Sequence, residues 1–336
     1  MVQHSTTIST DAYRSAREHA AFLEREDRGL IEVSGPDRAS FLQGLLTNDI
    51  GSLAAGAGCY AAYLTPQGRM ITDVFVYELG DLMLLTIARE TKDAVITKLD
   101  QNIFTEDVRV ADVTEKFAHV SIVGPRAASS LATLMDALEA SRLNGLPEHG
   151  NVRPSFAGQP AVVTLAGDLG EPGFDVYVNR QLVERFKAEL AAAGVAELDA
   201  GTAEGLRIEA GIPHFGRDMD EETIPLEAGI ESRAISFTKG CYVGQEVIVR
   251  VLHRGHGRVA RKLVGLAIET QSPPAAGALI RADDRQVGQI TSSAYSPRLM
   301  RSIALAYLQR DFVTPGTAVS VDGVSAVVTS LPFARQ

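Results

Sequence analysis

The stretch richest in chemically specific residues is 239–246, which reads Lys-Gly-Cys-Tyr-Val-Gly-Gln-Glu. Apolar residues recur after Val243 with the spacing of one helix face, which predicts a helix that ends near Gly255 and Gly257. The β-branched residues in the same run favour a strand instead, so the helix is the preferred of two interpretations. In a helix, Cys241 would stand at or just before the first turn, where free N–H groups and the dipole stabilise an anion.

Cys241 also has a lysine two residues before it, and a positive charge beside a thiol favours the thiolate. One interpretation is therefore a reactive or metal-ligating cysteine, with Lys239 as its activating neighbour. The other is a small residue chosen to fit a tight turn between Gly240 and Gly244. The local chemistry leaves both interpretations open.

The chain as a whole is acidic, with 42 Asp and Glu against 32 Lys and Arg and a net charge of −10. Such a surface disfavours non-specific contact with nucleic acids or membranes, so we expect no membrane partner and no direct nucleic-acid binding. The N-terminal residues are polar, and no apolar run is long enough to cross a bilayer. These features predict a cytoplasmic protein.

The two cysteines, Cys59 and Cys241, lie far apart and form no Cys-x-x-Cys pair. This excludes a disulfide framework, a structural zinc site of the usual spacing, and an iron–sulfur cluster held by the cysteines of one chain. Cys59 falls in an apolar run and is predicted to be a buried small hydrophobe. His253 and His256 follow Cys241, but histidines near a helix end are more often solvated, so no metal site is predicted.

A strand, a Gly-Pro turn and a helix occur twice in the first two thirds of the chain. Gly35 and Gly124 open the two turns, 89 residues apart, and Arg89 and Arg180 open the second helix of each unit, 91 residues apart. An internal duplication accounts for both offsets. It predicts two α+β layers, each with helices covering one face of a sheet.

The residue pattern of the sequence changes after Arg258, where short alternating apolar runs are separated by Gly, Pro and Asp. This pattern is typical of a small antiparallel barrel or sandwich. A short helix over 12–26 and a loop over 144–160 are also expected. The predicted organisation is a first α+β domain, a second one that is free to interleave with the first, a motif helix with its linker, and a C-terminal β domain: 1–115, 116–231, 232–257 and 258–336.

The motif at 239–246 resembles the hallmark of the YgfZ family, folate-binding proteins implicated in iron–sulfur cluster assembly or repair. That family is built like the glycine cleavage T-protein, an aminomethyltransferase that uses tetrahydrofolate. Further stretches resemble the T-protein over roughly residues 29–333: 35–46 with 48–49, 170–175, 206–213, 225–227, 288, 291–292, 296–297 and 303–307. The resemblance implies an α+β cloverleaf of two duplicated α+β domains and an antiparallel β-barrel. It places tetrahydrofolate, or a one-carbon derivative, in the central hole.

The resemblance also implies which residues hold the folate. Glu171 is similar to the T-protein glutamate that holds the pterin, whose edge can donate two hydrogen bonds to a carboxylate. Arg207 is similar to a residue that contacts the glutamyl carboxylate through bidentate geometry. The remaining expected cofactor-binding residues are Tyr242, Gln245 and Asp73, and the expected catalytic residues are Cys241 and Lys239.

Thr72-Asp73 departs from the T-protein pattern, in which a pair of aspartates occupies this hairpin. The first aspartate of that pair lies near the folate nitrogen that receives the one-carbon unit, and its position here is Thr72. A threonine cannot act as a carboxylate base, and alternation along a strand would turn Asp73 to the opposite side. This departure disfavours an aminomethyltransferase, so the sequence favours an accessory factor over an enzyme.

The predicted function is a tetrahydrofolate-binding YgfZ-type protein whose Cys241 supports iron–sulfur cluster assembly or repair in client enzymes, tRNA-methylthiolating enzymes among them. Its expected partners are folate and iron–sulfur client or assembly proteins, and a cluster would need ligands from a partner besides Cys241. The alternative is a folate-dependent aminomethyltransferase of the T-protein type, with Asp49 or Asp73 as its carboxylate. A folate-independent interaction protein is the third interpretation.

The densest group of basic residues follows the motif: Arg250, His253, Arg254, His256, Arg258, Arg261 and Lys262. It could dock RNA, an acidic protein or a polyglutamyl folate tail. It could equally be the solvated positive end of a helix and its linker. No aromatic residues lie between these charges, which argues against stacking of a single nucleic-acid strand.

Overall fold

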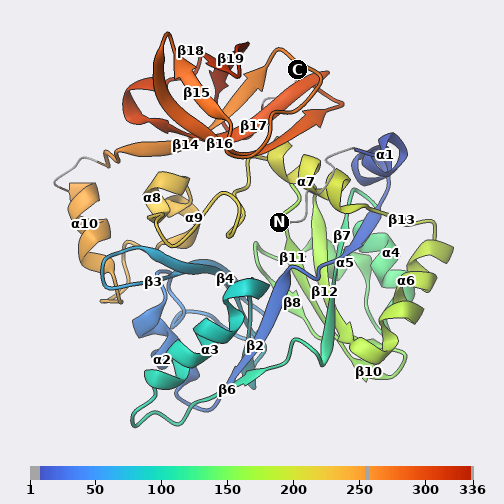
Figure 1. Ribbon diagram of the computed structural model, residues 1–336. Helices are drawn as coiled ribbons and strands as arrows, with labels where there is room; N and C mark the ends of the chain where they lie inside the picture. The colour runs from blue at the N-terminus through green and yellow to red at the C-terminus, as the bar shows by residue number, and fades with distance from the viewer. Residues whose placement is uncertain (1–7, 254–256, 334–336) are drawn as a thin grey trace.

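The computed structural model describes residues 8–253 and 257–333, and it places two α+β layers side by side beneath a β-barrel (Figure 1). The first layer is a five-stranded sheet in the order β3-β4-β5-β2-β6. Its elements are β2 (Arg28–Ser34), α2 (Arg38–Leu45), β3 (Gly58–Leu64), β4 (Met70–Glu78), β5 (Leu82–Ala88), the 3-10 helix η1 (Arg89–Thr91), α3 (Lys92–Gln101) and β6 (Arg109–Asp112). Because side chains alternate along a strand, one face of the sheet packs on α2 and α3, and the other faces the centre of the molecule.

The second layer is a six-stranded sheet in the order β13-β1-β7-β12-β11-β8. Its elements are β1 (Ala21–Glu24), β7 (Phe117–Val123), α4 (Ala127–Leu134), α5 (Ala140–Asn144), β8 (Asn151–Val152), β11 (Val162–Ala166), β12 (Gly173–Asn179), the 3-10 helix η2 (Arg180–Leu182), α6 (Val183–Ala192) and β13 (Ala196–Glu197). A separate pair of short strands, β9 (Ser155–Phe156) and β10 (Gln159–Pro160), lies between β8 and β11. Side chains of α4, α5 and α6 pack on one face of this sheet in a single core.

The two layers exchange a strand, which interleaves the two duplicated units. β1 precedes β2 in the chain but pairs with β7, and β6 precedes β7 but pairs with β2. The turn glycines show the same exchange, because both Gly35 and Gly124 have positive φ, 103° and 113°. A Cβ on Gly35 would meet Asp107 O, just before β6, whereas one on Gly124 would meet His19 O, just before β1. Only glycine accepts both the backbone conformation and the close approach at these turns.

The C-terminal unit is a closed barrel in the order β14-β17-β16-β15-β18-β19. Its elements are β14 (Arg261–Ile268), β15 (Leu279–Ala282), β16 (Arg285–Ser296), β17 (Arg301–Gln309), the 3-10 helix η3 (Arg310–Phe312), β18 (Ala318–Val321) and β19 (Val324–Thr329). Alternate residues of these strands point inward and form their own core. The helices between barrel and layers are α1 (Thr10–Glu18), α7 (Ala200–Glu209), α8 (Pro225–Ala228), α9 (Glu231–Ala234) and α10 (Gln245–His253).

The structure confirms the predicted fold, a duplicated α+β body with an antiparallel barrel. Two local expectations were wrong. The helix expected over 12–26 ends at Glu18, because the apolar residues that follow join the second sheet as β1. The stretch 144–160, expected to be a loop, contains the short strands β8, β9 and β10. Among the described residues, no helix combines the length and the apolar character needed to cross a membrane.

Candidate functional site

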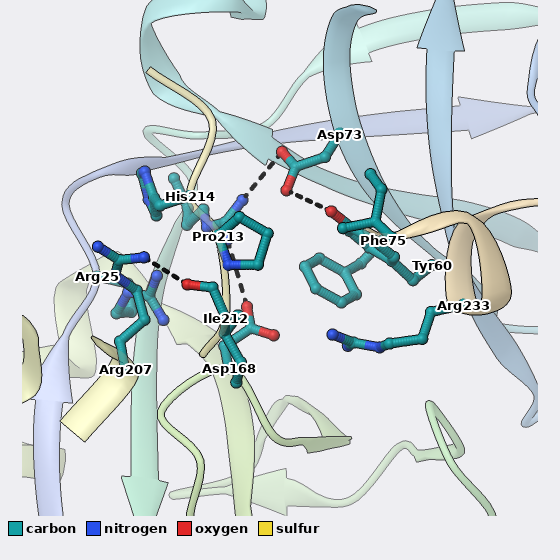
Figure 2. A pocket seen from close by; sticks show the side chains of 12 residues that line it. Arg25, Tyr60, Asp73, Phe75, Asp168, Arg207, Ile212, Pro213, His214 and Arg233 are labelled. Carbon is teal, nitrogen blue, oxygen red and sulfur yellow. Dashed lines mark hydrogen bonds and ion pairs between the residues drawn. The ribbon is translucent and has the colours of Figure 1, made fainter. Parts of the chain in front are cut away.

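A pocket lies at the centre of the molecule, where the first sheet, the segment after α7 and helix α9 meet (Figure 2). Four arginines, two aspartates and one histidine give it a strongly polar wall. The lining residues are Arg25, Arg28, Tyr60, Asp73, Phe75, Asp168, Arg207, Ile212, Pro213, His214, Ile230 and Arg233. The free space between them is about 10 Å³, so a ring-sized ligand can enter only when side chains at the mouth move.

Asp73 is the carboxylate that β4 presents to this pocket. It is 2% exposed and accepts a hydrogen bond from the Tyr60 hydroxyl at 3.1 Å through Oδ2. Its other oxygen, Oδ1, lies 3.7 Å from Arg28 Nη1, and neither of these two atoms has a hydrogen-bond partner among the described residues. Buried polar atoms are normally paired, so this acceptor and this donor are available to a ligand.

Thr72 faces the other side of the sheet, which corrects the sequence argument built on it. It pairs across the sheet with Tyr63, in the core beneath the helices, whereas Asp73 pairs with Ala62 on the central face. The Thr72 hydroxyl is buried, donates to Asp73 O at 3.0 Å and accepts from Thr91 Oγ1 at 3.1 Å. The carboxylate of the central pocket is therefore present in this chain, and alternation places Asp73 there.

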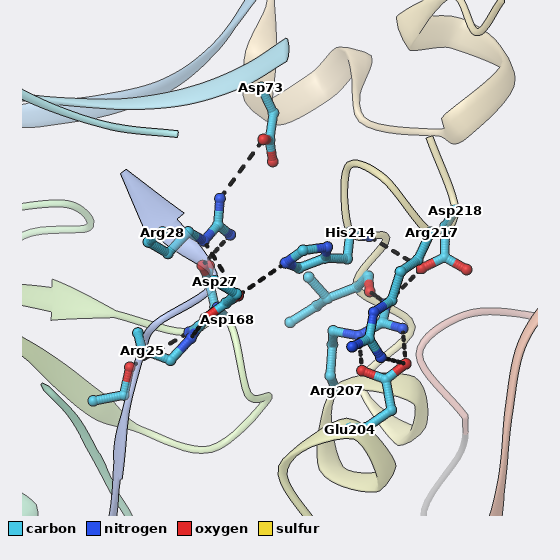
Figure 3. Close-up of polar contacts among 12 residues, drawn as sticks. Arg25, Asp27, Arg28, Asp73, Asp168, Glu204, Arg207, His214, Arg217 and Asp218 are labelled. Carbon is cyan, nitrogen blue, oxygen red and sulfur yellow. Dashed lines mark hydrogen bonds and ion pairs between the residues drawn. The ribbon is translucent and has the colours of Figure 1, made fainter. Parts of the chain in front are cut away.

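The arginines around Asp73 belong to a network of ion pairs (Figure 3). Arg25 holds Asp27 through two hydrogen bonds of 2.9 Å each, and His214 Nε2 lies 3.1 Å from the same carboxylate. Arg28 is 3.3 Å from Asp168. The buried cations of the pocket thus have carboxylate neighbours, which limits the cost of burying them.

Arg207 is not free to bind a ligand, contrary to the expectation from the resemblance. It is 4% exposed, and all five N–H groups of its guanidinium have protein acceptors. Nε and Nη2 hold Glu204 at 2.9 and 2.6 Å, Nη2 also donates to Ser292 Oγ, and Nη1 donates to Asp218 and to the Ile212 carbonyl. Burial alone would lower the pKa of Arg207, but Asp218 and Glu204 raise it above its ordinary value. Arg207 is therefore a structural cation.

Arg233 is the cation of the pocket that remains accessible. It comes from α9, is exposed, and lies with its guanidinium carbon 5.2 Å from the centre of the Tyr60 ring. Within the described parts of the chain, no carboxylate is within ion-pair distance of it, unlike Arg25, Arg28 and Arg207. Its position at the mouth makes it the side chain best able to move when a ligand enters.

Lys239 ties the motif to the rest of the first layer. Its ammonium donates to the carbonyl oxygens of Gln43, Leu46 and Asn48 at 2.7, 2.7 and 2.8 Å, at the end of α2. The side chain of Asn48 in turn donates to the carbonyls of Tyr60 and Arg233, two residues of the pocket. The three donors of Lys239 are thus committed to the backbone, so its role is to anchor the loop rather than to activate Cys241.

Cys241 is exposed, and it lies four residues before Gln245, the first residue of α10. The predicted helix exists, but it begins four residues after Cys241, so Cys241 does not occupy the helix N-terminus. The electrostatic effect of a helix dipole fades beyond the terminal turn. The tight turn is at Gly244, whose φ is 85° and whose Cβ would lie 2.6 Å from Thr65 O. The other cysteine, Cys59, is buried as predicted, and burial raises the pKa of its thiol to about 12.

We expect the replacement Lys239→Met to lower the free energy of unfolding by about 1–3 kcal/mol at pH 7, because three carbonyls lose their donor. Burial lowers the pKa of Lys239 to about 8, against 10.5 for a free lysine. The unfolded chain therefore binds more protons between these values, and this group makes the wild type more stable as pH rises from 8 to 10.5. Urea unfolding at pH 7 and 10 should show the deficit of the variant growing with pH. Lys98 is an exposed residue of α3 and serves as the control. A deficit that shrinks with pH, or an equal loss of stability in Lys98→Met, would contradict this role of Lys239.

Known proteins resemble the chain over almost its whole length. The profile of the GCVT N-terminal domain matches residues 3–239, and that of the glycine cleavage T-protein C-terminal barrel domain matches 261–334. The chain belongs to the glycine cleavage T-protein family. An aminomethyltransferase of Streptomyces avermitilis is 30% identical over 97% of this chain and 89% of its own. A putative chloroplastic transferase of Arabidopsis thaliana is 30% identical over 92% of this chain and 70% of its own.

A solved T-protein has the same fold. The glycine cleavage aminomethyltransferase T of Bartonella henselae superposes with a TM-score of 0.87, covering 97% of this chain and 89% of that one. At 24% identity this likeness concerns the fold alone. The two family profiles and the relatives at 30% identity confirm the T-protein part of the resemblance read from the sequence.

In this member of the T-protein family, only some of the residues predicted to bind folate line the central pocket. Asp73 lines the central pocket, but Glu171 does not: it is buried in an ion pair with Arg17 of α1. Tyr242 is buried in the central core beside Lys239, and burial raises its pKa to about 12. Gln245 begins α10 and is half-buried. Neither Tyr242 nor Gln245 is among the residues that line the central pocket.

Several pocket residues carried no signal in the sequence. Arg28, Tyr60 and His214 come from separate segments, and only the fold brings them together. Asp168 lines the pocket and stands three residues before Glu171, so the sequence pointed to this loop but not to the carboxylate that lines the pocket. Arg25 and Arg28 belong to a charged run that leads into β2, but such a run does not by itself indicate a ligand site.

The basic residues that follow the motif have different surroundings in the structure. Arg261 is bound to Glu227 at 3.1 Å and lies over the ring of Tyr307, whereas Arg258 and Lys262 are exposed. Arg254, His256 and the side chain of His253 lie outside the described residues. In the described part of the chain, no three His, Cys, Asp or Glu side chains are placed to hold a metal ion.

Proposed function

We propose that this chain binds tetrahydrofolate at the central pocket and transfers an aminomethyl-derived one-carbon unit to it. The observation that carries the proposal is Asp73, a buried carboxylate of the pocket whose Oδ1 has no hydrogen-bond partner among the described residues. The family supports it, since relatives of similar length are named aminomethyltransferases. With Asp73 in the pocket, the argument from Thr72 against an enzyme no longer holds.

The residues present fit such a ligand. A pterin edge carries both hydrogen-bond donors and acceptors, and the pocket offers an unpaired acceptor on Asp73 and an unpaired donor on Arg28. Tetrahydrofolate, when bound, supplies the nitrogen that accepts the one-carbon unit. Tyr60 orients the Asp73 carboxylate through its hydroxyl, and the low exposure of both side chains excludes water from the reacting region.

Asp73 can assist the transfer in two ways that need no other catalytic group. Its negative charge stabilises positive charge that develops nearby, an interaction strengthened by burial. Its unpaired Oδ1 can also take the proton that the attacking nitrogen loses. Arg28 Nη1 lies 3.7 Å from Asp73 Oδ1 and helps to hold the carboxylate in position.

A second candidate function concerns Cys241. It is an exposed thiol on a loop anchored by Lys239, within a motif that resembles the YgfZ hallmark. We propose, as this second function, that Cys241 serves iron–sulfur cluster maintenance in client enzymes while the folate pocket is retained. One cysteine cannot hold a cluster, so the client would supply the other ligands.

One comparison separates the two functions. We expect purified wild type and Cys241→Ser to transfer the carbon of an aminomethylated lipoyl carrier to tetrahydrofolate at rates within about twofold, because Cys241 does not line the pocket. In this transfer the amino group is released as ammonia and the lipoyl sulfur as a free thiol. Absence of transfer with the wild type would refute the first function. In cells lacking the gene, a loss of tRNA methylthiolation that wild type restores and Cys241→Ser does not would establish the second, and equal rescue by both would refute it.

A further inference from the structure

A second pocket, of about 360 Å³, lies between helix α1, the end of α7 and the barrel domain (Figure 1). Its wall includes Arg17 of α1, Glu209 at the end of α7, Arg298 of the turn between β16 and β17, and Phe333. We call it the side pocket. It shares only Ile212 with the central pocket, so it is a separate site that neither proposed function uses.

The acidic part of the side pocket is already bound by neighbouring side chains. Glu209 is 1% exposed and accepts hydrogen bonds from the Tyr13 hydroxyl at 2.8 Å, from the Ser296 hydroxyl and from Arg17 Nη2. The other outer nitrogen of Arg17, Nη1, donates to Glu171. Because one arginine serves two carboxylates, Arg17, Glu171 and Glu209 together carry one net negative charge.

Arg298 balances this charge without forming an ion pair. Among the described residues, no carboxylate lies within ion-pair distance of it, and its one hydrogen bond runs from Nη2 to the Phe333 carbonyl at 3.4 Å. Its Nε is buried and has no partner there, and the same holds for Nε of Arg17. Buried donors are normally paired, so two guanidinium N–H groups on the wall of one pocket lack an acceptor.

We propose that the side pocket binds a small organic acid that carries a single carboxylate. A carboxylate presents two acceptor oxygens, and charge-assisted hydrogen bonds from guanidinium groups are among the strongest that proteins form. The two arginines and the two glutamates around the pocket have charges that sum to zero. One added negative charge is therefore tolerated, whereas a dianion would leave unbalanced charge beside Glu209.

The volume and the remaining wall indicate that the acid has an apolar body. A water molecule takes up about 30 Å³ of liquid, so a pocket of about 360 Å³ holds much more than a carboxylate alone. Ile212, Pro332 and Phe333 supply apolar surface for that body. Because Ile212 also lines the central pocket, the bound acid would lie beside that pocket without entering it.

The test is calorimetric titration of the full chain with three probes: benzoate, 3-phenylpropionate and hexanoate. We expect at least one of them to bind saturably, and both its uncharged amide and the dianion succinate to bind at least about tenfold more weakly. Arg298→Met should weaken the bound probe by about tenfold or more, since hydrogen bonds to its carboxylate are lost. Arg301→Met is the matched control: it removes the same charge from an exposed residue outside the pocket and should stay within about twofold of the wild type.

A measurement on the wild type covers the case in which Arg298→Met folds poorly. In spectra of isotope-labelled isoleucine methyl groups, the probe should shift the signal of Ile212 and leave that of Ile87, in the core beneath α2 and α3, unchanged. Failure of all three probes to bind, an amide that binds as well as its acid, or shifts that spare Ile212 would overturn the inference. So would affinity that survives Arg298→Met in a folded sample, or that Arg301→Met lowers equally. None of these outcomes depends on whether the central pocket binds folate.

Discussion

Replacing Asp73 by asparagine is expected to reduce one-carbon transfer about 10²- to 10⁴-fold, the range associated with loss of a positioned acid–base group. The substitution keeps the shape and the hydrogen bond from Tyr60 but removes the negative charge and the unpaired basic oxygen. In the variant, Arg28 still has a carboxylate partner in Asp168, at 3.3 Å. The free energy of unfolding should therefore change by only about 1 kcal/mol. Steady-state transfer assays and urea unfolding on the same samples would measure both quantities.

Thr72→Val is the matched control for this prediction. It changes the adjacent residue, keeps its shape and removes a hydroxyl that faces the helices instead of the pocket. We expect transfer to remain within about twofold of the wild type and the free energy of unfolding to fall by about 1 kcal/mol, since one buried hydrogen-bonded group is lost. A larger loss of transfer in Thr72→Val than in Asp73→Asn would place residue 72 beside the reacting nitrogen and remove Asp73 from the reaction.

The case of Thr72 shows where sequence reasoning succeeds and where it fails. Strand and turn signals are local, so the hairpin of β4 (Met70–Glu78) and β5 (Leu82–Ala88) can be read directly from its alternating residues and the turn between them. Alternation correctly placed Thr72 and Asp73 on opposite faces. It could not say which face is central, because that depends on where α2, α3 and the second layer pack.

The internal duplication could be predicted from the sequence because its signals are local, whereas the exchange of strands between the two layers could not. Repeated turns at Gly35 and Gly124 are local features, so their offset can be read directly. Pairing of β1 with β7 joins residues about a hundred positions apart, and β1 has only four residues with which to signal it. The same limit applies to the pocket, whose walls are assembled from segments that periodicity treats separately.

Charged residues were the hardest to assign, because a lone sequence shows a cation but not its partners. Lys239 lies two residues before Cys241 in the sequence, which suggested that it activates the thiol. Its ammonium instead binds backbone carbonyls at the end of α2. Arg207 and Arg233 look alike in the sequence, and only the fold shows that one is saturated while the other is exposed. The saturated hydrogen bonding of Arg207 gives the second large effect.

Replacing Arg207 by methionine is expected to lower the free energy of unfolding by about 3–5 kcal/mol at pH 7, because it leaves buried carboxylates without their cation. Asp218 has no exposed side-chain surface, and Glu204 has little. Burial alone would raise the pKa of Glu204, but Arg207 lowers it to about 2. That lowered pKa stabilises the fold above the unfolded value of 4.5, and the contribution is lost as pH falls toward 2. The deficit of the variant should therefore be largest at pH 7 and smaller at pH 3.

Arg217→Met provides a matched control, since Arg217 also contacts Glu204, at 3.0 Å, but is itself 44% exposed. An exposed ion pair contributes about 0–1 kcal/mol, so this variant should remain near the wild type. Urea unfolding of both variants at pH 7 and 3, with calorimetric folate binding by the folded fraction, would separate the roles of the two arginines. If Arg207→Met kept its stability but lost affinity for tetrahydrofolate, Arg207 would be the ligand contact that the resemblance implied.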